Sequence, residues 1–134
     1  MALKPRPTDA ELAVLRVLWT RGPSTVREVH DHMAEARAVG YTTTLKTLQV
    51  MTEKGLTDRA DERGQHVYSP SATEHDTLHQ LVTDLLDRAF GGSTARLVVQ
   101  ALASKRATPE ELTEIRRLLD AAETAKRGPR DSRD

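Results

Sequence analysis

The first part of the chain divides into three short segments, 8–22, 24–40 and 42–55, and each segment ends at a glycine. Apolar residues recur three or four positions apart within each segment, which places them on one face of an α-helix. The second helix is expected to start at Ser24 and the third at Thr42. Isolated helices of this length are only marginally stable in water. The three are therefore expected to pack together as a tri-helical group, the usual frame of a helix-turn-helix.

Local signals mark the ends of these helices. Thr8 and Glu11 have the spacing of a capping box, in which each side chain accepts a hydrogen bond from the other residue's backbone amide. Gly22-Pro23 and Gly55 are typical helix stops. The expected buried stripes are Leu12, Leu15, Leu18 and Trp19 in the first helix, Val26, Val29 and Met33 in the second, and Leu45, Leu48 and Met51 in the third.

The pattern changes after the third helix. Leu56–Arg59 and Gln65–Ser69 are expected to be short strands, joined by the polar turn Asp61–Gly64 and ended by Pro70. A hairpin that directly follows three helices gives the element order of a winged helix-turn-helix. Residues 1–70 are therefore predicted to form a winged helix-turn-helix domain.

The apolar spacing of the remaining chain is helical again, with a break at Gly91-Gly92 and a second capping box at Thr108 and Glu111. We expect a mainly α fold with a small β-hairpin wing, followed by a helical dimerisation region over residues 71–125 and a disordered tail over 126–134. Three helices in fewer than about 60 residues bury too little surface for a core of their own, so a homodimer is expected. The predicted dimerisation residues are Leu78, Leu81, Val82, Leu85, Leu86, Phe90, Leu97, Leu102, Leu112, Ile115 and Leu119.

Composition excludes several classes of function. The 134 residues include no cysteine, which removes disulfides, thiolate catalysis and cysteine-based metal sites. No apolar run reaches the ~20 residues of a membrane span, and no apolar export signal follows the first residue. A cytoplasmic protein without a membrane partner is therefore expected. Nucleophile and phosphate-loop motifs are also absent, so we predict no enzymatic activity and no cofactor.

The start of the third helix is the main candidate site. Threonine hydroxyls and a lysine amine there can reach phosphate oxygens and base edges of double-stranded DNA, and a helix N-terminus favours phosphate. Two arginines flank the turn of the wing, where they can meet the DNA backbone or the minor groove. The predicted DNA-binding residues are Thr42, Thr43, Thr44, Lys46, Thr47, Arg59 and Arg63. The alternative is that Thr42 merely caps the helix and the other side chains are solvated.

The overall charge of the chain argues against DNA binding. The net charge is zero and is evenly spread along the chain, whereas many DNA-binding domains are basic. Asp58, Asp61 and Glu62 also dilute the positive field of the wing. A winged-helix module that binds another protein is therefore the alternative function.

Two of the histidines have a spacing that could suit a metal ion. His75 and His79 are four residues apart on a helix, so both could face one ion. No third ligand can be identified, and solvated or interface histidines are the simpler interpretation. We predict no metal site, and a small metal-dependent enzyme would rest on these histidines alone.

Five motifs stand out along the chain: ELAVLRVLW at residues 11–19, GPSTVREV at 22–29, YTT at 41–43, EKGL at 53–56 and VYSP at 67–70. Together they resemble the BlaI/MecI/CopY family of bacterial penicillinase-type repressors, and the resemblance runs from about residue 8 to residue 122. It implies a homodimer in which each winged helix binds half of a dyad-symmetric operator while the C-terminal helices intertwine.

The resemblance assigns the base and phosphate contacts to Thr42, Thr43, Lys46 and Thr47. Lys46 departs from the threonine that is common in many members, and Val50 stands where a basic residue is frequent. Copper-sensing members carry a C-terminal cysteine cluster that this chain lacks. Antibiotic-responsive members are cleaved at an Asn-Phe bond, but the corresponding pair here is Gln100-Ala101, so proteolytic induction is not implied. The operator, the regulated genes and the inducing signal are left open.

Overall fold

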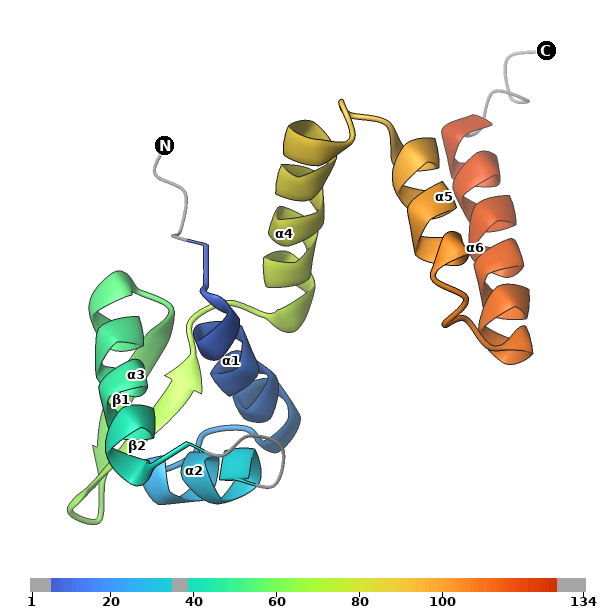
Figure 1. The fold of residues 1–134 in the computed structure, drawn as a ribbon. Helices are drawn as coiled ribbons and strands as arrows, with labels where there is room; N and C mark the ends of the chain where they lie inside the picture. The colour runs from blue at the N-terminus through green and yellow to red at the C-terminus, as the bar shows by residue number, and fades with distance from the viewer. Residues whose placement is uncertain (1–5, 35–38, 128–134) are drawn as a thin grey trace. The chain divides into compact units, whose positions relative to one another are not determined.

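The structure, a computed structural model, describes residues 6–34 and 39–127 (Figure 1). Its elements are α1 (Asp9–Arg21), α2 (Val26–Ala34), α3 (Tyr41–Lys54), β1 (Thr57–Glu62), β2 (Gln65–Pro70), α4 (Glu74–Ala89), α5 (Thr94–Ala103) and α6 (Pro109–Arg127). The prediction of a mainly α fold with a small β-hairpin wing is confirmed. The chain divides into two compact units, and the boundary follows Asp84 within α4.

The core of the first unit lies between α1, α2, α3 and the hairpin. Its buried apolar side chains are Val14, Leu15, Leu18, Val26, Val29, Met33, Leu48, Met51, Leu56 and Tyr68. The predicted stripes were too wide at Leu12, Trp19 and Leu45, which are only half-buried. The stripes also omitted Val14, and Tyr68 of β2 closes the core from the side of the wing.

Ser24 belongs to the sheet and does not start a helix. Its amide donates to the carbonyl of Tyr68 over 2.9 Å, and the amide of Tyr68 donates back to its carbonyl over 2.8 Å. This isolated bridge adds a third, single-residue strand to the antiparallel β1–β2 pair. The second helix begins at Val26, and Thr25 and Glu28 cap it reciprocally, with amide-to-side-chain distances of 2.9 and 3.2 Å. The predicted start at Ser24 is wrong because the sheet uses its backbone.

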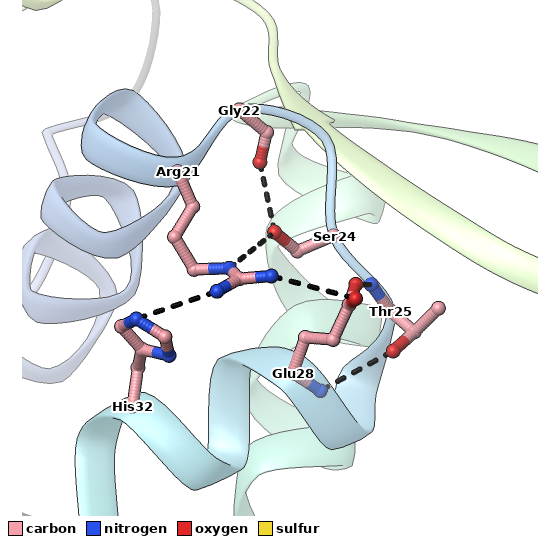
Figure 2. A network of polar contacts seen from close by, with 6 residues as sticks. All are labelled: Arg21, Gly22, Ser24, Thr25, Glu28 and His32. Carbon is pink, nitrogen blue, oxygen red and sulfur yellow. Dashed lines mark hydrogen bonds and ion pairs between the residues drawn. The ribbon is translucent and has the colours of Figure 1, made fainter.

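Polar side chains fix the turn between α1 and α2 (Figure 2). The guanidinium of Arg21 donates to Ser24 Oγ and to His32 Nε2, each over 3.4 Å, and pairs with Glu28 over 3.4 Å. Ser24 Oγ in turn donates to the carbonyl of Gly22 over 2.8 Å. The Thr25 amide bond, with help from the charge of Arg21, lowers the pKa of the Glu28 carboxyl. The turn therefore has one geometry, and α2 leaves it in a defined direction.

A buried carboxylate connects the N-terminal end of α1 to the C-terminal end of α3. Glu11 is 4% exposed, and its Oε1 accepts the amide of Thr8 over 2.9 Å as the predicted capping box requires. Its Oε2 accepts a hydrogen bond from Lys54 Nζ over 2.8 Å. Burial by itself raises the pKa of Glu11, but the bonds from Lys54 and Thr8 outweigh burial, so the pKa lies below its ordinary value.

The hairpin leaves α3 through a left-handed residue. Gly55 has φ of 85°, and its amide donates to the carbonyls of Met51 and Thr52 at the end of the helix. The hydroxyls of Thr52 and Thr57 then lie 2.9 Å apart, which ties the last turn of α3 to the first residue of β1. The position of the wing therefore follows from that of α3.

The three C-terminal helices contain no buried residue within the part of the chain that the structure describes. The break at Gly91-Gly92 separates α4 from α5, and the Thr108–Glu111 capping box starts α6. Lys126 and Arg127 still belong to α6, so the predicted disordered tail begins too early; the rest of that tail, 128–134, lies outside the described residues. None of the described helices is both long enough and apolar enough to cross a membrane.

Replacing Glu11 by Gln tests the α1–α3 connection. The variant loses a charged hydrogen bond, so we expect it to be less stable than the wild type by about 1–3 kcal/mol near neutral pH. Because the pKa of Glu11 is lower in the folded than in the unfolded state, its stabilisation is complete above the unfolded-state pKa. It is lost as the pH falls through the folded-state pKa.

Urea unfolding at about pH 7 and about pH 3 measures the difference. The gap between the wild type and Glu11→Gln should narrow at the lower pH. Glu53→Gln, which changes an exposed carboxylate on α3, serves as the control and should leave the pH dependence unaltered. An equal gap at both pH values would contradict this role of Glu11.

Candidate nucleic-acid interface

The N-terminal turn of α3 is open to an anion. Its N-cap is Gly40, which supplies no side-chain hydrogen bond, and no acidic residue lies in the first turn. The alternative that Thr42 caps the helix is therefore wrong, because Thr42 lies inside the first turn and is exposed. Free backbone N–H groups and the positive end of the helix dipole favour a phosphate at such a position.

The following turns present a polar surface. Thr43 and Lys46 are exposed, and Lys46 makes no ion pair or hydrogen bond within the described residues. Thr47 is half-buried, and its hydroxyl donates to the carbonyl of Thr43 over 2.9 Å, which leaves mainly its methyl group for contact. Two donor side chains and several methyl groups thus lie along one edge of the helix.

Thr44 corrects the predicted set. It is 2% exposed, and its hydroxyl donates back to the carbonyl of Gly40 over 3.4 Å. Positions 44, 48 and 51 form the buried side of α3, where Thr44 lies in line with Leu48 and Met51. Its spacing of four residues from Leu48 and seven from Met51 places it on the predicted buried stripe, so the periodicity of α3 could have excluded it from the site.

Arg59 lies in a cleft between α3 and the wing. It stands opposite Tyr68 in the hairpin register and lines a cleft of about 620 Å³ together with Gln49, Glu53 and Asp58. The two carboxylates offset its charge there. Farther out, His66 Nδ1 donates to Asp61 Oδ1 over 2.6 Å across the strands. The side of the wing is therefore close to neutral.

Arg63 forms the tip of the wing in a strained conformation. Its φ is 52° and that of Gly64 is 79°, the left-handed pair found in two-residue hairpin turns. Asn, Asp or Gly usually occupies the first of these positions, since a larger L-residue there costs energy. The arginine side chain is exposed at the point of the hairpin farthest along the strands from the core.

One stacked pair was missed in the sequence. The guanidinium carbon of Arg27 on α2 lies 4.6 Å from the ring centroid of Tyr41, the first residue of α3. His30 contacts the same ring edge-on, with centroids 5.7 Å apart. The pair depends on how α2 crosses α3, and no spacing within either helix reports that angle.

His75 and His79 stack on each other, with ring centroids 6.3 Å apart, and have no third candidate ligand beside them among the described residues. Within residues 6–34 and 39–127, no three His, Asp or Glu side chains come together in a way that could hold a metal ion. The groups that the site offers are an amine, hydroxyls and backbone N–H groups, all of which can donate hydrogen bonds to an anion.

The three helices followed by a hairpin define a winged-helix protein. Its third helix is exposed and has an open N-terminus, as in proteins that bind nucleic acid. The sequence matches the family model of the penicillinase repressor over residues 7–121, and the chain belongs to this family. The family places it among transcriptional repressors and not among enzymes.

Relatives cover most of the chain. The transcriptional regulator BlaI of Mycobacterium tuberculosis is 32% identical over 121 residues, which are 89% of this chain and 86% of the relative. The penicillinase repressor of Bacillus licheniformis is 24% identical over 123 residues, or 92% of this chain and 96% of the relative.

Solved structures agree with the fold. The monomeric form of Bacillus licheniformis BlaI, in complex with the blaP half-operator, has 28% identity and a TM-score of 0.50, and the match covers 57% of this chain and 93% of that one. Wild-type MarR of E. coli has a TM-score of 0.50 at 15% identity over 87% of this chain and 77% of its own, a likeness of fold alone.

The strain at the wing tip gives a prediction about stability. Arg63→Gly removes the side chain that makes the left-handed conformation costly, and the greater freedom of glycine in the unfolded chain offsets part of the gain. We expect the variant to be more stable by about 0.5–1 kcal/mol in urea unfolding.

Arg63→Ala keeps the Cβ atom and should show no such gain, which separates strain from charge. Arg59→Gly should lower the stability of the protein, because Arg59 lies in the extended part of β1, where glycine weakens a strand. Destabilisation by Arg63→Gly would show that the tip is held by contacts of the arginine side chain.

Proposed function

We propose that this chain is a dimeric, sequence-specific repressor that binds a dyad-symmetric operator and occludes a promoter. The observation that carries the proposal is the exposed N-terminal half of α3, which is free of carboxylates and open to phosphate. The similarity to BlaI of Bacillus licheniformis, which was solved in complex with a half-operator, supports operator binding by this chain.

In the proposed complex α3 lies in the major groove. Lys46 donates to guanine O6 or N7, the methyl groups of Thr43 and Thr47 contact thymine, and Thr42 with the open helix end binds phosphate. Arg63 at the wing tip, and Arg59 behind it, attract the DNA backbone without reading its sequence. Recognition is thus assigned to α3 and general affinity to the wing.

Dimerisation is assigned to the C-terminal helices, with domains at 1–70 and 71–125. Leu78, Val82 and Leu85 are each more than two-fifths exposed on α4, as are Leu102 on α5 and Leu119 on α6. The other predicted positions, Leu81, Leu86, Phe90, Leu97, Leu112 and Ile115, are half-buried. A second copy would cover these side chains and align two recognition helices with two half-sites. DNA as the target also implies a cytoplasmic location.

A protein-binding module remains the second candidate, because the wing carries Asp58, Asp61 and Glu62 on exposed positions. Binding to duplex DNA that weakens as salt increases separates the two functions, since each phosphate contact releases counterions. A chain that binds no duplex DNA at low salt would favour the protein-binding function.

The DNA found upstream of the chain's own gene is the first probe for an operator. Lys46→Ala and Thr43→Ala should each weaken binding to this duplex by about 1–3 kcal/mol, because each loses a base contact. Both side chains are exposed, so the fold should be retained. Fluorescence anisotropy against this duplex and a random one measures the effect.

Lys54→Ala is unsuitable as a control because Lys54 holds Glu11, so Lys105→Ala, a change outside the winged-helix unit, is the matched charge control. Arg63→Ala should lower affinity for both duplexes alike. Unchanged operator affinity in both α3 variants would show that another surface reads the DNA.

Leu85→Asp tests the dimer. Leu85 is 48% exposed in the single chain, so an aspartate there is tolerated by the monomer but is desolvated at an interface with a second copy. We expect sedimentation to show a wild-type dimer and a monomeric variant, with much weaker operator binding because the half-site contacts are no longer linked.

Thr83→Asp adds the same charge to α4 outside its apolar stripe and should leave the dimer intact. A wild-type protein that sediments as a monomer at micromolar concentration without DNA would contradict the proposed dimer.

A further inference from the structure

Arg27 stands beside the recognition surface on a different helix. It extends from the first turn of α2 to the ring of Tyr41, at 4.6 Å from the ring centroid. Tyr41 is 38% exposed, and two residues of α2 contact its ring: the stacked guanidinium of Arg27 and the edge-on ring of His30. A guanidinium that lies on an aromatic face keeps its N–H groups free to donate in the plane.

Within residues 6–34 and 39–127, no carboxylate forms an ion pair with this cation. Arg27 is exposed and has no ion pair among the described residues. Glu28 is already engaged by the amide of Thr25 and by Arg21, and Asp31, one turn farther along α2, forms no ion pair with Arg27. The charge is instead held next to the first residue of α3, whose initial turn also lacks an acidic side chain.

The guanidinium is stacked on the ring of the first residue of α3, the positive end of that helix dipole. A cation beside the positive end of a helix dipole is repelled by it. An anion at the same place is attracted both by the cation and by the dipole. The stacking on Tyr41 keeps the guanidinium in place despite that repulsion. A bound anion would therefore interact at once with a planar, bidentate donor and with the N-terminal turn of α3.

We propose that Arg27 is a DNA-contacting residue outside α3 and the wing, which clamps one backbone phosphate at the edge of the groove that α3 enters. Tyr41 is its positioning residue. The inference rests on the proposed DNA-binding function and adds a third element, α2, to the surface that binds DNA. The contact is to phosphate, so it supplies affinity and register and no base recognition.

Arg27→Gln is the first test, with a random-sequence duplex and the duplex from upstream of the gene measured at several salt concentrations. Loss of a charged hydrogen bond to phosphate should weaken binding to both duplexes by about tenfold at low salt. The slope of log K against log salt should become shallower by about one unit, a change that a merely structural role would not produce.

Three further variants separate charge from position. Arg27→Lys keeps the charge but loses the planar donor, so the salt slope should be kept while affinity falls by a few fold. Tyr41→Phe keeps the platform and should bind as the wild type does. Tyr41→Leu removes the platform and should weaken binding with Arg27 still present.

Arg16→Gln is the matched control, because Arg16 is an exposed arginine on α1 and has no ion pair among the described residues. Urea unfolding checks that each variant is folded. Arg27→Gln binding no worse than Arg16→Gln, or losing affinity for the upstream duplex alone, would overturn the inference and leave the proposed function standing. A wild-type chain that binds neither duplex would overturn the proposed function itself.

Discussion

The geometry of the winged helix depends on one buried carboxylate. Glu11 caps the first turn of α1 and at the same time accepts a hydrogen bond from Lys54 in the last turn of α3. Gly55 follows Lys54 directly and turns the chain into β1, so the carboxylate that fixes the end of α3 also fixes where the wing begins. A residue that looks like an ordinary helix cap in the sequence thus sets the relation between the two elements proposed to contact DNA.

Local patterns were sufficient for much of this fold. Two capping boxes, the glycine stops and the change of period at the hairpin were predictable because each depends on residues within a few positions of one another. The Thr25–Glu28 box has the same motif and could have been found, which would have placed the start of α2 correctly. The Ser24–Tyr68 bridge could not, since it joins residues far apart in the chain.

The candidate site shows the same division. Exposure of Thr42, Thr43 and Lys46 follows from the periodicity of α3, and so does the burial of Thr44, four residues before Leu48. The stack of Arg27 on Tyr41 joins two helices and could not be found from the spacing within either one. The zero net charge of the chain was also a poor guide. The first turn of α3 carries no acidic residue, whereas Asp58, Asp61 and Glu62 lie on the wing, so the net charge of the whole chain does not describe the charge at the start of α3.

Dimerisation through the C-terminal helices, as proposed, would make the behaviour of the chain depend on its concentration. Because α4, α5 and α6 bury no residue within the described chain, their apolar side chains have no intramolecular core to stabilise them. In the proposed dimer a second copy would cover those side chains. The free energy of this burial would stabilise both the helices and the dimer, so both would depend on protein concentration by mass action. Packing of these helices and association of two copies would thereby be coupled, so the fraction of dimer would rise with protein concentration. Occupancy of the operator would then rise more steeply than the number of chains.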